Sequence, residues 1–190
     1  MSTSTQVLTF EQWLRLPETK QRYEIVDGVM YMPPGPSGHH QWIAQEVFVR
    51  GRDFVRSKGL GVFMMAPFDV MIQREPLRVR QPDVMYLNTQ RTGIGGMADL
   101  RGINFLEVPP DLVIEVVSPS NTRQEMDAKL RDYHRIGVYQ CWIFSPEAGT
   151  AEIIDLTSGG PTISAVYTVN ETLRSDLLPG FELNLQEIFR

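Results

Sequence analysis

Two acidic residues in apolar surroundings, and a lysine that follows one of them, are the side chains in this sequence best suited to chemistry. Glu115 lies in the run Asp111–Val117, where its neighbours are Val, Ile and Leu, a pattern typical of a strand buried on both faces. A carboxylate there stays charged only beside a metal ion or a Lys or Arg partner, and otherwise takes up a proton. Asp83 has a similar setting in Gln81–Leu87, and Lys129 lies on an expected helix after the Glu115 strand. This combination favours a reaction site over a purely structural one.

Strand geometry selects Asp83 and Glu115 as the pair that can share one ligand. Asp111 and Glu115 are four residues apart on one strand, which separates them by about 13 Å at about 3.3 Å per residue. A single metal ion bound at about 2.0–2.6 Å cannot span that distance. Asp83 belongs to a different expected strand, and neighbouring strands run only about 4.8 Å apart. The alternative is a pair of carboxylates held by hydrogen bonds to the glycine-containing loop Thr89–Glu107.

Lys129, Glu24 and His40 are the further candidates for this site. Helical spacing places Lys129 about 70° from the centre of the buried stripe of its helix. Its long side chain can therefore reach toward Glu115, and the alternative is a solvated lysine. Glu24, on an expected hairpin, is either a third acid of the site or part of an exposed face. His40, at the start of a long helix, either contacts substrate or lies on the surface.

The composition is that of a globular protein, with 42% hydrophobic and 22% charged residues among 190. This length suits a single domain over residues 1–190. No apolar stretch approaches the roughly 20 residues of a membrane span, and Met1–Val7 lacks a signal-peptide pattern. The lone Cys141 cannot form an intrachain disulfide, so we expect a cytoplasmic protein. The net charge of −5 argues against nonspecific coating of nucleic acid, but not against a nuclease whose acids bind metal.

Local signals predict the elements that position these side chains. A hairpin is expected over Arg22–Met32 around the turn dipeptide Asp27-Gly28, and a long helix from the Ser37 cap to Lys58. Strands are expected at Val62–Ile72, Arg80–Leu87, Asp111–Val117, Tyr139–Phe144, Ala151–Leu156 and Ser164–Val169, with a helix capped by Asn121 or Thr122 and ending near Gly137. This order predicts an α/β (α+β) fold, a mixed sheet flanked by helices with an N-terminal β-hairpin.

These motifs also resemble those of a known bacterial family. The matching residues are Tyr23–Gly28, Gln81–Asp83, Pro110–Ser120, Lys129, Tyr133, Gly137-Val138, Tyr139–Trp142 and Leu178–Phe181. From about Leu8 to Phe189 the chain resembles the "putative restriction endonuclease" family within the PD-(D/E)xK nuclease superfamily. The resemblance implies a restriction-endonuclease-like core and magnesium-dependent cleavage of phosphodiester bonds. It departs from the superfamily pattern at Val117, where a lysine is usual; families of this type supply that lysine from the following helix, at the position of Lys129.

The sequence and the resemblance together predict a Mg²⁺-dependent endonuclease acting on DNA, with Mn²⁺ as an alternative ion. The expected catalytic residues are Asp83, Glu115, Lys129 and Glu24, and the expected metal ligands are Asp83, Glu115 and the carbonyl of Val116. Substrate contacts are expected from His40, Arg52 and Arg56, with Arg50, Lys58, Arg74, Arg78 and Arg80 as further candidates for phosphate contacts. The resemblance also implies a homodimer, because cutting both strands usually needs two active sites. The alternatives are a non-catalytic nucleic-acid- or partner-binding module that keeps the nuclease fold, and a structural domain of a larger system.

Overall fold

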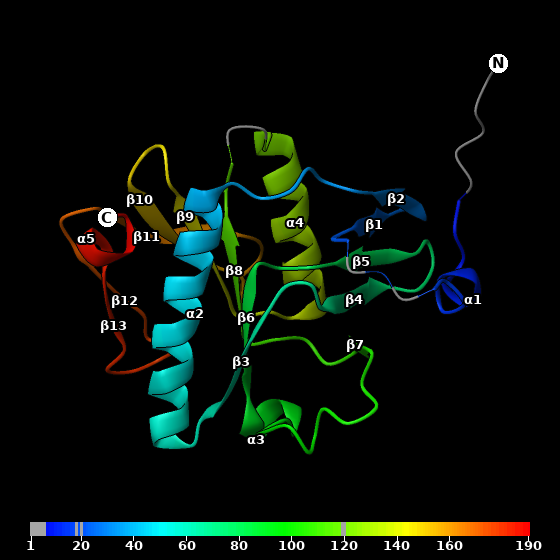
Figure 1. Cartoon of the computed structure of the whole chain (residues 1–190), viewed down its shortest axis with the longest axis horizontal. Coiled ribbons are helices and arrows are strands. Elements are labelled where there is room, and N and C mark those ends of the chain that lie inside the picture. The colour runs from blue at the N-terminus through cyan, green and yellow to red at the C-terminus, as the bar shows by residue number, and fades with distance from the viewer. Residues whose placement is uncertain (1–6, 18, 20, 119–120) are drawn as a thin grey trace.

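A six-stranded sheet in the order β11-β10-β9-β8-β6-β3 is the largest element of the fold. The computed structural model describes residues 7–17, 19, 21–118 and 121–190 (Figure 1), so most of Met1–Val7 and the Pro119-Ser120 part of the family motif lie outside the described residues. The strands are β3 (Gly61–Met65), β6 (Val84–Asn88), β8 (Leu112–Val116), β9 (Gln140–Ser145), β10 (Thr150–Asp155) and β11 (Thr162–Thr168). β8 and β9 are parallel, and the other neighbouring pairs are antiparallel. The predicted mixed sheet is confirmed.

Helix α4 (Arg123–Ile136) makes the crossover between the parallel strands β8 and β9. It begins at a capping box, in which the Thr122 side chain accepts from the Glu125 N–H and the Glu125 side chain accepts from the Thr122 N–H. Thr122 rather than Asn121 is therefore the cap. The helix ends at Gly137, which adopts the left-handed conformation that glycine tolerates. Its buried Leu130 packs in a core cluster on one side of the sheet.

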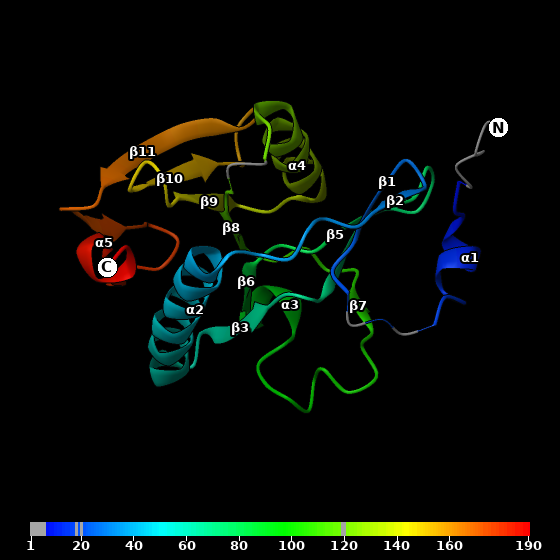
Figure 2. The ribbon, with the colours of Figure 1, turned by 45° about the horizontal axis from the view of Figure 1, so that its top comes forward.

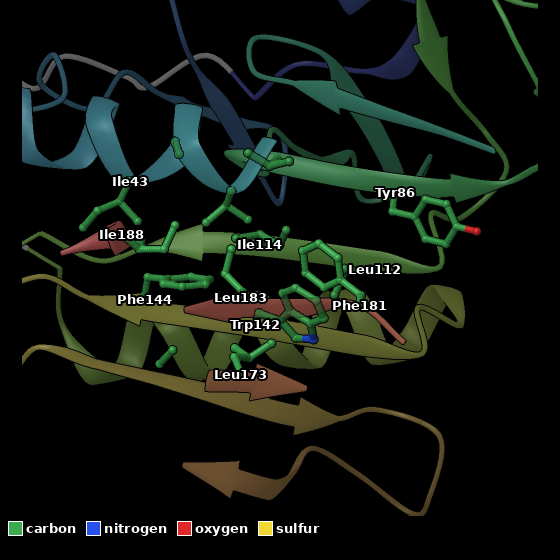
Figure 3. Close-up of a cluster of buried hydrophobic side chains, with 14 of the residues drawn as sticks. Ile43, Tyr86, Leu112, Ile114, Trp142, Phe144, Leu173, Phe181, Leu183 and Ile188 are labelled. Carbon is green, nitrogen blue, oxygen red and sulfur yellow. The ribbon is translucent and has the colours of Figure 1, made fainter. Parts of the chain in front are cut away.

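Helix α2 (Gly38–Lys58) covers the opposite side of this sheet, as Figure 2 shows. The Ser37 side chain accepts from the His40 N–H at its start, and left-handed Gly59 ends it, as the sequence predicts. Its inner residues join β6, β8 and β9 in a second cluster, which the C-terminal elements β12 (Thr172–Arg174), β13 (Glu182–Asn184) and α5 (Leu185–Ile188) complete (Figure 3). The labelled members of this cluster are Ile43, Tyr86, Leu112, Ile114, Trp142, Phe144, Leu173, Phe181, Leu183 and Ile188. Helices thus cover both faces of the central strands of this sheet.

A smaller sheet with the strand order β2-β1-β5-β4-β7 stands beside the first. Its strands are β1 (Glu24–Val26), β2 (Val29–Tyr31), β4 (Asp69–Gln73), β5 (Arg78–Arg80) and β7 (Phe105–Leu106), and α1 (Phe10–Trp13) packs against it. The predicted hairpin is β1 and β2, and both turn residues, Asp27 and Gly28, have positive φ angles, as a type I′ turn requires.

The sequence predicts uninterrupted strands over Val62–Ile72 and Arg80–Leu87, and both predictions are wrong because each segment is interrupted. The first segment divides into β3 and β4, and the second into β5 and β6, with each half in a different sheet. Pro67 and Pro82 lie at the two divisions and lack the N–H group that a strand ladder needs. As a consequence, Asp83 lies where the chain passes from the smaller sheet into the larger one.

The segment Thr89–Glu107, predicted as a loop, contains the short helix α3 (Thr89–Thr92) and strand β7. Ile94 and Leu106 are buried in the cluster beneath α4, so these two points anchor the segment to the core. No helix among the described residues is long and apolar enough to cross a membrane.

Candidate active site at the junction of the two sheets

Asp83 and Glu115 lie side by side, as the strand arithmetic predicts. β6 pairs with β8 so that Val84 faces Ile114, which sets the preceding Asp83 beside Glu115. Asp83 Oδ2 accepts a hydrogen bond from the backbone N–H of Val116 at 2.7 Å. Both carboxylates are almost fully buried, with 3% and 2% exposure. Two desolvated acids next to each other repel unless positive charge lies between or beside them.

Lys129 supplies part of that charge from α4. Its Nζ lies 2.9 Å from Glu115 Oε2 and 2.8 Å from Glu24 Oε1. Tyr133, one turn further along the same face of the helix, donates its hydroxyl to Glu115 Oε1. The structure therefore brings Glu24, Glu115 and Lys129 into one ion-paired cluster, and the solvated position considered for Lys129 is excluded.

Arg22 provides positive charge beside Asp83, and His40 contacts the same carboxylate. The Arg22 guanidinium forms an ion pair with Asp83 Oδ1, and His40 Nε2 lies 3.1 Å from Asp83 Oδ2. Sequence reasoning missed Arg22, although a signal was present. Residues two apart on a strand share a face, so Arg22 and Glu24 at the start of the hairpin were candidates for the same site.

Glu24 also belongs to a buried network of ion pairs with Arg80, Asp132 and Arg78. Arg80 lies 2.7 Å from Glu24 Oε2 and 2.7 Å from Asp132 Oδ2, and Arg78 also contacts Asp132 at 3.1 Å. Arg80 is only 5% exposed, so the expectation that it contacts phosphate is wrong. The sequence pattern of β5 does not indicate that Arg80 pairs with Asp132, because Asp132 lies on α4, 52 residues away.

The protonation behaviour of the four central groups follows from burial and these partners. Burial raises the pKa of Asp83, but the His40 hydrogen bond and the Arg22 charge outweigh it and lower that pKa to about 2. Burial raises the pKa of Glu115 above its usual range, with Lys129 opposing the rise. Burial also raises the pKa of Glu24, yet Lys129 and Arg80 leave it below its usual range.

Lys129 keeps its charge despite its surroundings. Burial lowers the pKa of Lys129, but the Glu115 and Glu24 carboxylates outweigh burial and raise it above its usual value. A buried ammonium between two carboxylates is thus a fixed positive charge at neutral pH. Such a charge is preorganised, since no solvent has to reorient around it when negative charge develops nearby.

A cleft of about 390 Å³ opens at Asp83. Its polar lining includes Arg22, His40 and Asp83, and the loop Met32–Pro36 with Met65–Pro67 forms its apolar wall. A ligand in this cleft would meet the Asp83 end of the site first.

The structure does not bring all predicted substrate contacts to this cleft. His40 lines it, whereas Arg52 and Arg56 are exposed further along α2. At about 1.5 Å per residue they lie about 18 and 24 Å along the helix axis from His40. Arg52 also pairs with the adjacent Asp53 at 2.7 Å. Contacts with the reacting phosphate are therefore left to residues nearer the cleft.

The donor set at the junction suits a hard cation. Mg²⁺ and Mn²⁺ prefer oxygen ligands, and Asp83 and Glu115 offer adjacent carboxylate oxygens beside the backbone of Val116. Among the residues that the structure describes, no cluster of three or more His, Cys, Asp or Glu side chains could hold a metal ion. A metal here would therefore depend on two carboxylates, a backbone carbonyl and water.

Comparison with known proteins identifies the class and then the family. A solved structure from Anabaena variabilis, described as a putative nuclease belonging to DUF820, superposes with a TM-score of 0.79 over 96% of this chain and 97% of that one, at 18% identity. The two proteins therefore share one fold. The family model described as "Putative restriction endonuclease" (Uma2) matches residues 10–186, so the chain belongs to this restriction-endonuclease-like family. No curated protein matches it.

Proposed function

We propose that this protein is a metal-dependent endonuclease that hydrolyses phosphodiester bonds in DNA. The observation that carries the proposal is the placement of Lys129 Nζ 2.9 Å from Glu115 Oε2, with Asp83 bound to the N–H of the next residue, Val116. Two acids on adjacent strands and a buried lysine supply the charges that hydrolysis of a phosphodiester requires. Membership of a restriction-endonuclease-like family supports the same reading.

In this proposal Asp83, Glu115 and the carbonyl of Val116 hold Mg²⁺, or Mn²⁺ in its place. The bound ion would supply a water of lowered pKa and positive charge at the scissile phosphate. The two carboxylates are fixed for this task before any ligand arrives. Asp83 is held by the Val116 N–H, and Glu115 by the Tyr133 hydroxyl.

Lys129 is proposed to orient the attacking water or to stabilise the negative charge that develops on the phosphate. Glu24 acts through Lys129, as a positioning residue. It contacts the same ammonium as Glu115, and Arg80 contacts Glu24 in turn. The chain of ion pairs runs from Lys129 through Glu24 and Arg80 to Asp132, and it thereby links the small sheet to α4.

DNA is the proposed partner. His40 lies at the cleft and would contact the strand that enters it. Arg52 and Arg56 lie four residues apart and are both exposed on α2, so they would contact backbone phosphates away from the reacting one. Such contacts orient the duplex without reading its sequence.

A homodimer is also proposed, and the free edge of β11 supports it. This seven-residue strand ends the six-stranded sheet and contains no charged residue or proline that would oppose pairing with another strand. Ile163 and Val166 are 59% and 54% exposed beside that edge. Two copies related by a twofold axis could pair these edges as antiparallel strands.

A non-catalytic module that keeps the nuclease fold is the second candidate. One observation favours it: both oxygens of Asp83 already have partners in Arg22, His40 and the Val116 N–H. A site neutralised by the protein itself is stable without a metal. The endonuclease would bind a divalent ion and cleave DNA, whereas the non-catalytic module would do neither.

Divalent-metal titration followed by a plasmid-nicking assay separates the two candidates. An enzyme is expected to bind Mg²⁺ or Mn²⁺ by calorimetry, to nick supercoiled DNA in its presence, and to stop when EDTA is added. A protein that binds DNA but neither binds a divalent ion nor nicks the plasmid would be the non-catalytic module. A parallel assay on single-stranded RNA tests the choice of DNA as substrate.

A further inference from the structure

Arg22 holds an unusual position on the most exposed side of the charged site. Its Nη1 contacts Asp83 Oδ1, and its Nη2 donates to the carbonyl of Gln81 at 2.5 Å. Its side chain is 22% exposed and lines the cleft, whereas that of Asp83 is 3% exposed. Arg22 is therefore the more exposed partner of this ion pair, and a ligand in the cleft would meet both residues.

The partners of Arg22 and His40 are incomplete. Among the described residues, Arg22 Nε and His40 Nδ1 are two of the three buried side-chain nitrogen or oxygen atoms that have no hydrogen-bond partner. A buried polar group without a hydrogen-bond partner destabilises the state in which it is left unpaired. Both atoms belong to the two side chains that contact Asp83 at the cleft. Arg22 and His40 therefore have hydrogen-bonding capacity that Asp83 does not use.

Arg22 and a divalent ion would both bind the Asp83 carboxylate. The three carboxylates Asp83, Glu115 and Glu24 are matched by three basic side chains, those of Arg22, Lys129 and Arg80, so the acids of the site are neutralised as they stand. A divalent ion would add two positive charges beside Arg22. A bound phosphodiester would add one negative charge and so offset part of the charge of the ion. A guanidinium can bind two phosphate oxygens at once, in bidentate geometry.

We infer that Arg22 is a phosphate-binding residue of this site that occupies Asp83 as an internal cation until a divalent ion and a nucleic-acid phosphate take over its two roles. The inference rests on the proposed function and adds an order to it. Arg22 opposes metal binding in the free protein and favours it once a phosphate is present, because the guanidinium then has a new anion to bind. Metal and phosphate would thus bind with positive coupling.

Binding of Mn²⁺ followed by electron paramagnetic resonance, without nucleic acid, tests the first half. Arg22→Met is expected to bind Mn²⁺ roughly tenfold more tightly than the wild type, because a like charge next to the ion has gone. Arg22→Lys keeps the charge and should bind Mn²⁺ like the wild type. Arg174→Met is the matched control, since Arg174 also pairs with a carboxylate, Glu182, but on the exposed surface. Equal or weaker binding by Arg22→Met would overturn the inference.

Adding thymidine 3′,5′-bisphosphate tests the second half. The bisphosphate should tighten Mn²⁺ binding by the wild type and have little effect on Arg22→Met or Arg22→Lys, neither of which can offer a guanidinium fork. Thermal unfolding without metal identifies variants that do not fold. If Arg22→Met does not fold, Arg22→Gln removes the same positive charge and takes its place in both measurements. An equal tightening in wild type and Arg22→Met would also overturn the inference.

The outcomes separate this inference from the function beneath it. If wild type and Arg22→Met bind Mn²⁺ equally, Arg22 does not compete with metal and the proposed nuclease site stands. If no variant binds Mn²⁺, the metal site fails and the inference falls with it. Binding by Arg22→Met and not by the wild type would be the strongest support for an internal cation.

Discussion

At the scale of single residues, buried charge organises the site. Lys129 contacts Glu115 and Glu24, and Arg22 contacts Asp83, so each central acid has a basic partner from a different element. The sequence identified Asp83, Glu115 and Lys129 because charged residues in apolar segments are conspicuous. The spacing of Arg22 and Glu24 could have placed Arg22 at the site, but no local pattern pairs Arg22 with Asp83, which is 61 positions away.

The first prediction concerns Lys129→Met, which keeps the apolar stem and removes the charge. The sequence alone suggests near-wild-type stability, but the structure predicts a loss of about 3–5 kcal/mol, because Glu115 and Glu24 would be left buried without their shared cation. Cleavage should fall by about 10²-fold or more. Urea unfolding and a nicking assay measure the two effects. Exposed Arg131→Met on the same helix is the control, and a variant as stable and as active as wild type would remove Lys129 from the mechanism.

The second prediction concerns pH and Asp83. Its pKa of about 2 in the fold lies below the value of about 3.9 for an unfolded chain. The ionised carboxylate therefore stabilises the fold above pH 4, and this contribution is lost as pH falls toward 2.

Urea unfolding in EDTA at several pH values measures this contribution. The stability gap between wild type and Asp83→Asn should shrink by about 1 kcal/mol between pH about 6 and about 3. A gap that stays constant over this range would mean that Arg22 and His40 do not hold Asp83 in its charged form.

At the scale of elements, the sequence predicted those with local start and stop signals. The Ser37 and Thr122 caps and the Asp27-Gly28 turn all act where the sequence places them. It failed where tertiary structure decides, because nothing local indicates that Val62–Ile72 would serve two sheets. The same failure hid how Asp83 is positioned, since that residue lies at the crossing between the sheets.

The third prediction concerns the start of β3, which must pass close to β6. Gly61 has a φ of 153°, and a Cβ there would lie 2.0 Å from the carbonyl oxygen of Leu87. Gly61→Ala should therefore cost about 2 kcal/mol or more in unfolding free energy. Gly59→Ala is the control, because Gly59 also has positive φ but open space around it, and about 1 kcal/mol is expected there. Equal losses would show that β3 and β6 approach less closely than the structure indicates.

At the scale of the whole molecule, β11 forms one edge of the six-stranded sheet, and none of the described strands pairs with its outer side. The six-stranded sheet ends at β11, and the proposed dimer places a second β11 there. Restriction-like cutting of both strands would then come from two sites in one assembly. The net charge of −5 makes such a protein depend on local positive charge for DNA contact.

The fourth prediction concerns this assembly. Light scattering at micromolar concentration should give twice the 21.7 kDa mass of one chain. Val166→Lys places a charge beside the free edge and should reduce the mass to that of a monomer. Val108→Lys, at another exposed valine, should not. A wild type that remains monomeric with DNA and metal present argues against the homodimer, and a dimer insensitive to Val166→Lys argues for a different interface.

The central claim is that Asp83, Glu115 and Lys129 form one metal-dependent nuclease site. The most direct test is the rate of supercoiled-plasmid nicking in Mg²⁺ by wild type and by Glu115→Gln, purified in the same way so that any contaminating nuclease appears in both. We expect nicking by the wild type that EDTA abolishes. In Glu115→Gln the nicking rate should fall by about 10²-fold or more, and metal binding should be lost as well. Nicking at equal rates by the two proteins, or no metal-dependent nicking by a folded wild type, would contradict the account.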